Sequence, residues 1–112
     1  MNMATTWRMP NAVWDKISEK HRLPPGFNAD LWVTSASAFY PDHGDDWLYG
    51  VIHNTLNFGT TLQSYHGTIL YEMDFGHQVG LQYVEGVGVI VLSKVRVVVR
   101  SSDNTILSAY PY

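Results

Sequence analysis

The chain lacks cysteine altogether, which excludes both a disulfide framework and a thiolate metal site. It also lacks a strong charge of either sign. A net charge of −3 at pH 7 argues against binding nucleic acid mainly through bulk charge, because that mode favours a clearly basic domain. No apolar run approaches the roughly 20 residues that span a bilayer, and Met1 to Pro10 lack the charged-then-apolar pattern of a signal peptide. We therefore expect a cytoplasmic protein with no membrane partner.

The chain has enough apolar and aromatic sequence to build one core. Hydrophobic residues make up 46% and aromatic residues 13% of the 112 positions, so disorder is expected only in the first several residues. A chain of this length forms a single domain. We expect residues 1–10 to be flexible, residues 11–59 to form a helical part, and residues 67–112 to form an antiparallel sheet.

Two segments have the spacing of amphipathic helices. Asn11 can cap a first helix that runs to about Arg22. Asp45 or Asp46 can cap a second helix, and Gly59 is a natural end for it. The second helix has an apolar stripe that consists of Leu48, Val51, Ile52, Thr55 and Leu56.

From Gly67 onward the apolar residues recur at every second position, which is the period of a half-buried strand. The strands are predicted over residues 68–75, 79–84, 89–100 and 105–110. Short turns rich in glycine, asparagine or aspartate join each strand to the next, so the four should pair in chain order. The fold class predicted is α+β, with N-terminal helices packed on one face of a four-stranded antiparallel sheet and the other face open.

The third predicted strand gathers its cations on one face. Because side chains alternate between faces, Lys94, Arg96 and Arg100 share one side with Val98, and Val95, Val97 and Val99 share the other. An ordinary solvated face explains this pattern, and so does a wall that binds phosphate. Glu72 and Asp74 fall on the same side as the cations. Glu72 could act as a general base, or the carboxylates could simply pair with Arg96 or Lys94 across the sheet.

The final strand depends on its register. A loop of three residues, 102–104, in which Asn104 adopts the left-handed conformation, pairs Arg100 with Ile106, Val98 with Ser108, and Arg96 with Tyr110. Ser108 and Tyr110 then join the cations. A loop of two residues would turn both side chains to the core instead. Because a serine buried opposite a valine is the less favourable outcome, we expect the first register.

The histidines are scattered, and no spacing of His, Asp or Glu matches a metal site, so no metal and no cofactor is predicted. Imidazole titrates near neutral pH, which makes histidine a candidate acid or base. His53 lies beside the apolar stripe of the second helix, and His66 comes directly before the first strand. For each of them the alternative is an exposed or capping histidine.

The segment from Thr68 to Pro111 resembles the ribonuclease toxin superfamily that groups barnase, the EndoU nucleases, the tRNA-cleaving colicins and the RelE toxins. The resemblance lies in the strand Gly67 to Phe75, the valine-rich strand with basic residues, the short turn, and the terminal Ser108-Ala109-Tyr110-Pro111. It implies metal-independent RNA cleavage through the ribose 2′-hydroxyl, in a toxin of bacterial competition. RNA would be the substrate, an immunity or antitoxin protein the partner, and the cytoplasm of a target cell the place of action.

The resemblance also implies roles for particular side chains. Its catalytic candidates are His53, His66, Glu72, Arg96, Ser108 and Tyr110, and its substrate-binding candidates are Lys94 and Arg100. The cations would stabilise the phosphorane, Ser108 would hold a phosphate oxygen, and Tyr110 would stack on a base or shuttle a proton. The paired histidines and lysine of the EndoU branch are missing. The alternative function is a non-catalytic immunity or inhibitor-type protein, whose acidic balance suits docking on a basic surface.

Overall fold

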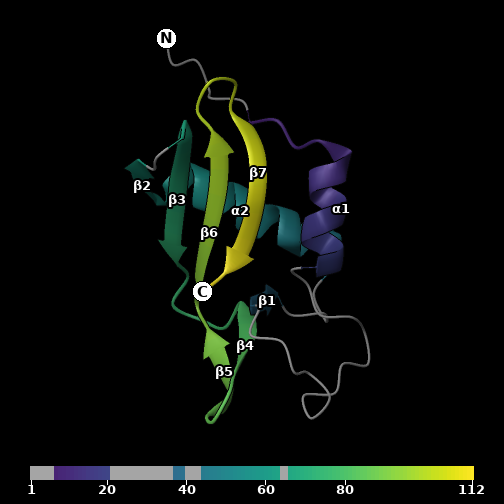
Figure 1. The fold of residues 1–112 in the computed structure, drawn as a ribbon, viewed down its shortest axis with the longest axis vertical. Coiled ribbons are helices and arrows are strands. Elements are labelled where there is room, and N and C mark those ends of the chain that lie inside the picture. Colours follow the sequence, from purple (N-terminus) through teal and green to yellow (C-terminus); the bar gives the residue numbers. More distant parts are fainter. Residues whose placement is uncertain (1–6, 21–36, 40–43, 64–65) are drawn as a thin grey trace.

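The computed structural model describes residues 7–20, 37–39, 44–63 and 66–112, which form two helices and two antiparallel sheets (Figure 1). The helices are α1 (Asn11–Lys20) and α2 (Asp45–Phe58). The strands are β1 (Ser37–Phe39), β2 (Thr60–Gln63), β3 (Thr68–Asp74), β4 (Gly80–Val84), β5 (Gly88–Leu92), β6 (Lys94–Arg100) and β7 (Thr105–Pro111). One sheet has the order β2-β3-β6-β7, and the other has the order β1-β4-β5.

The prediction of helices on a single four-stranded sheet in chain order is wrong. The predicted strand 89–100 is interrupted at Ser93, and β4 and β5 leave the larger sheet as a hairpin that pairs with β1. β3 pairs instead with β6, from Thr68 opposite Arg100 to Asp74 opposite Lys94. Short turns identify strands that are adjacent along the chain, but they do not exclude a hairpin that projects from the sheet. Residues 37–39 also form a strand inside the part expected to be helical.

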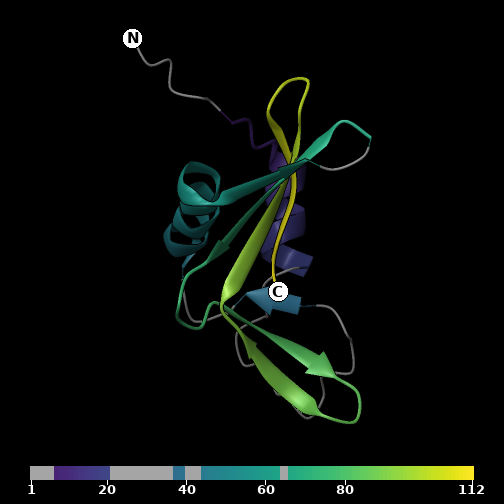
Figure 2. The ribbon, with the colours of Figure 1, turned by 90° about the vertical axis from the view of Figure 1, so that its left-hand side faces the viewer.

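Helix α2 lies across one face of the four-stranded sheet, as the edge-on view in Figure 2 shows. Its predicted apolar stripe is confirmed, because all five residues of that stripe are buried. Its predicted end is also confirmed, since Gly59 donates its N–H to the Thr55 carbonyl. Gly44 rather than Asp45 or Asp46 occupies the N-cap. The two carboxylates lie in the first turn, where the positive end of the helix dipole favours them.

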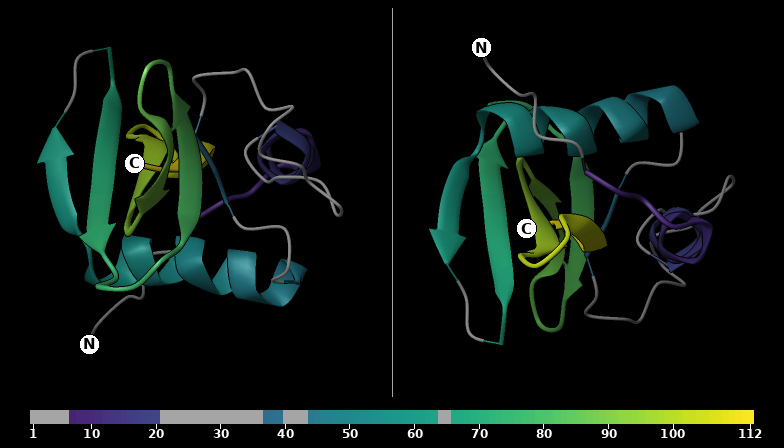
Figure 3. Two further views of the ribbon diagram at one scale, coloured as in Figure 1. Left: turned by 90° about the horizontal axis from the view of Figure 1, so that it is seen from below. Right: turned by 90° about the horizontal axis from the view of Figure 1, so that it is seen from above.

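Three of the four valines of β6 form the centre of the core. Val95, Val97 and Val99 are completely buried, together with Ile106 and Ala109 of β7. Helix α1 runs beside β7 and contributes the buried Ile17 (Figure 3). Asn11 is predicted as the cap, but it is the first residue of the helix, which therefore begins one residue earlier than predicted. The predicted end at Arg22 lies outside the described residues.

Of residues 1–10, which are predicted to be flexible, residues 1–6 lie outside the described residues, whereas Trp7 and Arg8 pack against the sheet. Arg8 forms a parallel bridge with Thr105, and its N–H donates to the Asn104 carbonyl at 3.0 Å. Trp7 meets the Tyr71 ring edge-on, with 6.1 Å between the ring centroids. This segment therefore pairs with part of the outer edge of β7.

The β6–β7 turn contains four residues, 101–104, so that Arg100 lies opposite Thr105 and the predicted pair of Arg100 with Ile106 is wrong. Asn104 has a φ of 58°, the left-handed conformation expected for it. Asp103 accepts a hydrogen bond from the Thr105 N–H and forms an ion pair with Arg100. The side-chain hydrogen bond from Arg100 is the main reason that the pKa of Asp103 is lowered to about 2.

A bulge in β7 corrects the register beyond the turn. The ladder shifts by one residue between Val98 and Val99 of β6, and Leu107 becomes the extra residue of β7. Beyond the bulge, Val98 lies opposite Ser108 and Arg96 lies opposite Tyr110, which confirms both predicted pairs. The bulge thus compensates for a turn one residue longer than expected.

Two glycines provide a matched test of the packing. Gly50 lies inside α2, and a Cβ there would meet nothing within 4 Å. At Gly80 a Cβ would lie 2.5 Å from the Ala38 carbonyl oxygen and 2.6 Å from Pro111 Cγ, where the two sheets meet. We expect Gly50→Ala to stabilise the fold by about 0.5–1 kcal/mol and Gly80→Ala to destabilise it by about 1–3 kcal/mol.

Urea unfolding followed by circular dichroism measures both changes. Equal effects of the two substitutions would show that the two sheets do not pack closely at Gly80.

Candidate functional site

The face of the four-stranded sheet opposite α2, here called the open face, is not covered by any described helix or strand (Figures 2 and 3). One row of cross-strand partners crosses it: Thr60, Glu72, Arg96 and Tyr110. Directly opposed residues of an antiparallel pair place their side chains on the same face. The strand pairing therefore brings a carboxylate, a guanidinium and a phenol together from three strands.

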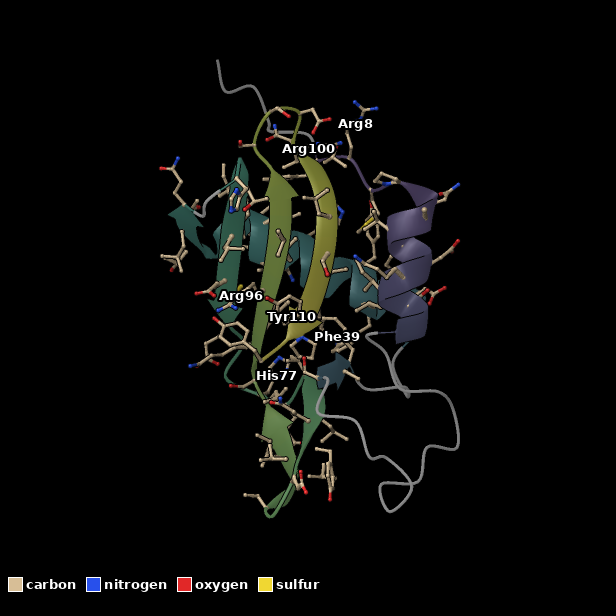
Figure 4. The ribbon with its side chains drawn as sticks, in the orientation of Figure 1. Arg8, Phe39, His77, Arg96, Arg100 and Tyr110 are labelled. Carbon is tan, nitrogen blue, oxygen red and sulfur yellow. The ribbon has the colours of Figure 1, made fainter. Side chains whose placement is uncertain are left out.

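Arg96 is held by three of its neighbours. Its Nε and Nη2 donate to Glu72 Oε2, and its Nη1 donates to the Tyr110 hydroxyl at 3.3 Å. The Tyr112 ring stacks on the guanidinium, with 4.4 Å between Arg96 Cζ and the ring centroid. We call Glu72, Arg96, Tyr110 and Tyr112 the Arg96 cluster; Figure 4 shows Arg96 and Tyr110 side by side on β6 and β7.

The charge state of the cluster follows from these contacts. Burial alone would lower the pKa of Arg96, but hydrogen bonds with Tyr110 and Glu72 outweigh burial, so the pKa is raised. Burial is the main cause that raises the pKa of Tyr112, and the nearby Glu72 carboxylate adds to it. At neutral pH the cluster therefore contains a charged guanidinium and, at Tyr112, a neutral phenol that can donate a proton.

The three predicted cations lie on one face of β6, but they do not lie close together. Lys94 is exposed beside the cluster, with its Nζ 5.8 Å from the centroid of the Tyr112 ring. Arg100 lies four residues beyond Arg96 along β6, about 13 Å away in an extended strand, and it is paired with Asp103. Lys94 and Arg96 therefore both lie by the Tyr112 ring. Arg100 lies at the other end of the strand from Arg96, as Figure 4 shows.

Ser108 lies in the row next to the cluster, opposite Val98, which in turn lies opposite Leu70. Its hydroxyl is thus on the open face, as the predicted register requires, and two residues from Tyr110. Leu62 continues this row on β2 and leaves 44% of its surface exposed. A strip of apolar side chains therefore borders the charged cluster.

The two candidate histidines lie away from the cluster. His53 belongs to α2, on the opposite side of the sheet. The centroid of its ring lies 4.2 Å from that of Tyr49, and its Nε2 is buried without a hydrogen-bond partner. Burial lowers the pKa of His53. His66 is exposed in the connection before β3, next to the strand end where Thr68 pairs with Arg100. Neither imidazole is adjacent to Arg96.

Sequence reasoning missed Tyr112. It follows Tyr110 by two positions, so the same alternation that placed Tyr110 on the open face predicts Tyr112 there as well. The backbone supports this, because the Tyr112 N–H donates to the Lys94 carbonyl at 2.8 Å and extends the ladder beyond β7. The alternation therefore indicates Tyr112 as well, but the predicted strand 105–110 stops two residues before it.

Comparison with family models, with curated proteins and with solved structures found no match for this chain. Among the described residues, no three His, Asp or Glu side chains are grouped so that they could hold a metal ion. None of the helices in the described ranges is long and apolar enough to cross a membrane.

A double-mutant cycle tests whether the ion pair at the centre of the cluster is coupled. Glu72→Gln or Arg96→Gln alone leaves a partly buried charge unpaired, whereas the double change leaves none. The side chains of Arg96 and Glu72 retain 30% and 16% of their exposure, so solvent screens the pair, and we expect a coupling energy of about 1 kcal/mol.

Urea unfolding of the four proteins measures this coupling, and raising the salt concentration should reduce it. If the two single changes in unfolding free energy add up to that of the double variant within about 0.3 kcal/mol, Glu72 and Arg96 are not coupled.

Proposed function

We propose that this protein is a metal-independent RNA-cleaving domain and that the Arg96 cluster is its active site. The observation that carries the proposal is the direct contact of Arg96 with both Glu72 and Tyr110 on an uncovered sheet face. Cleavage through the ribose 2′-hydroxyl needs a base, an acid and a positive charge at the phosphate. Glu72 can supply the base, Tyr110 the acid and Arg96 the positive charge.

The reaction follows from their chemistry. The Glu72 carboxylate takes the proton from the 2′-hydroxyl, and O2′ forms a bond to the adjacent phosphorus. Arg96 stabilises the additional negative charge on the phosphorane. The bond from phosphorus to O5′ then breaks, and Tyr110 gives its proton to O5′. The products are a 2′,3′-cyclic phosphate and a free 5′-hydroxyl, and solvent carries the proton from Glu72 back to Tyr110.

The surroundings of the cluster support RNA as the substrate. Phenol rings at Tyr110 and Tyr112 can stack on unpaired bases, and the Ser108 hydroxyl can hold a phosphate oxygen. Lys94 adds a positive charge beside the Tyr112 ring. Arg100 is too far along the strand to contact the same phosphate, and the mechanism does not use His53 or His66. In a toxin of bacterial competition, such a domain would be blocked by a cognate immunity or antitoxin protein.

The chemistry predicts a specific pattern of RNA cutting. With EDTA present, the purified protein should cut total tRNA or ribosomal RNA at low salt and leave 2′,3′-cyclic phosphate ends. Glu72→Gln or Tyr110→Phe should lower the rate by about a hundredfold or more, because each removes a proton-transfer group. A substrate with 2′-deoxyribose at the cut position should resist cleavage completely.

Tyr83→Phe is the matched control, since Tyr83 lies on β4 outside the four-stranded sheet and should cut at the native rate. Arg96→Ala is a poorer test, because it also leaves the partly buried Glu72 carboxylate without its ion-pair partner. Uncut RNA at every salt concentration, or cutting that EDTA abolishes, would be incompatible with this mechanism.

A second candidate function, a non-catalytic immunity or inhibitor-type protein, is favoured by the β4–β5 hairpin. The hairpin projects from the rest of the structure (Figure 1), and Val87, Val89 and Val91 expose 72%, 38% and 52% of their surfaces. β5 is also the edge of its sheet and contains no charged residue that would discourage pairing. An apolar edge strand of this kind suits addition to a sheet of another protein.

The two functions predict different phenotypes. If the protein cuts RNA, its expression alone should arrest growth, and Glu72→Gln should restore growth. If it is a binding protein, expression should be harmless, and Val89→Lys with Val91→Lys should prevent complex formation with a basic nuclease domain encoded beside it. In the second case Glu72→Gln should leave the complex intact, which size-exclusion chromatography of the mixture would show.

A further inference from the structure

Lys16 of α1 reaches across to the bulge in β7. Its Nζ donates a hydrogen bond of 3.0 Å to the Leu107 carbonyl, a half-buried contact between residues 91 positions apart in the sequence. Leu107 is the extra residue at the point where the β6–β7 ladder shifts register. The bond therefore joins the first helix to the one irregular position in the strand that carries Ser108 and Tyr110.

The bulge decides which face these two side chains occupy. Near the turn, Arg100 lies opposite Thr105 and Val99 lies opposite Ile106. If this ladder continued without a bulge, Ser108 would lie opposite Val97 and Tyr110 opposite Val95, on the core face. With the bulge they lie opposite Val98 and Arg96, on the open face. The Arg96 cluster forms in the bulged register alone.

The contact with Lys16 is possible only in the bulged register. In a regular antiparallel strand the N–H and C=O of one residue point to the same side, and the side alternates along the chain. The Ile106 N–H points away from β6, because it donates to the Arg8 carbonyl at 2.8 Å. In a regular strand the Leu107 carbonyl would then point toward β6. It instead points outward to Lys16, which is the orientation that a bulge permits.

We propose that Lys16 is a positioning residue of the Arg96 cluster: its ammonium holds the Leu107 carbonyl in the bulge that keeps Ser108 and Tyr110 on the open face. The consequence for RNA cutting rests on the proposed function, whereas the consequence for strand register does not. Packing of Ala109 and Pro111 in the core favours the same register. The ammonium adds a charge-assisted hydrogen bond to a carbonyl that the ladder leaves unpaired.

Engineered disulfides can report the register, because the native chain has no cysteine. Val98→Cys with Ser108→Cys places two thiols directly opposite each other in the bulged register, within the Cα separation that a disulfide requires. Val97→Cys with Ser108→Cys does so only in the unbulged register. The ratio of the two oxidation rates therefore measures how strongly the bulged register is preferred.

With Lys16 present, the pair at 98 and 108 should oxidise at least about tenfold faster than the pair at 97 and 108. Lys16→Met should reduce this ratio by about tenfold, because a bond to a charged donor is lost. Lys16→Arg keeps a cationic donor and should preserve the ratio. Circular dichroism confirms folding of each variant, and Lys16→Gln replaces Lys16→Met if the methionine variant does not fold.

A ratio that Lys16→Met and Lys16→Gln leave unchanged would overturn the positioning role, and faster oxidation of the pair at 97 and 108 would overturn the register itself. RNA cutting is measured in parallel on the cysteine-free Lys16 variants. We expect kcat to fall about tenfold in Lys16→Met and to recover in Lys16→Arg. If the native chain cuts no RNA, the proposed function fails, and the disulfide ratio still decides the role of Lys16.

Discussion

The position of β6 between β3 and β7 is the constraint on which the rest of the structure depends. Val95, Val97 and Val99, three of its four valines, are completely buried on the side of α2, so the strand cannot rotate or slip by one residue without exposing them. Because alternate residues face opposite ways, this burial fixes Arg96 on the open face. The pairing with β3 and β7 then determines that Glu72 and Tyr110 are its neighbours.

The contacts within the Arg96 cluster have two consequences for the proposed function. The guanidinium is held from several sides, so little reorganisation is needed when charge develops beside it. The same contacts compensate its charge through Glu72, which reduces the long-range attraction of an RNA by a chain that is acidic overall. Under the proposed function, close contacts from the phenol rings and the strip of apolar side chains beside the cluster would therefore have to provide most of the binding.

The two sheets are joined where the chain leaves β3 and returns to β6. The Phe75 N–H donates to the Ser93 carbonyl and the Val79 N–H donates to the Leu92 carbonyl. These bonds hold together the two ends of the segment that contains the hairpin. Gly80 lets β4 approach both its partner β1 in the three-stranded sheet and the end of β7 in the four-stranded sheet. The hairpin can therefore project an apolar edge while the register of the four-stranded sheet remains undisturbed.

The sequence by itself determined the local features of this protein. The apolar stripe of α2, its end at Gly59, the alternation in β6 and the left-handed Asn104 all follow from side chains within a few residues of one another. The pairs of Val98 with Ser108 and Arg96 with Tyr110 also followed, because a period of two and the cost of burying Ser108 favour one register.

Only the tertiary structure decided which strands are neighbours, where the histidines lie and how the register is corrected. Backbone hydrogen-bonding groups are the same in every strand, so no local pattern could show that β3 pairs with β6 and that β4 and β5 leave the sheet. The distance of His53 and His66 from Arg96 follows from this arrangement. The bulge at Leu107 reconciles a four-residue turn with the burial of Ala109 and Pro111, and its contact with Lys16 comes from a helix 91 residues away.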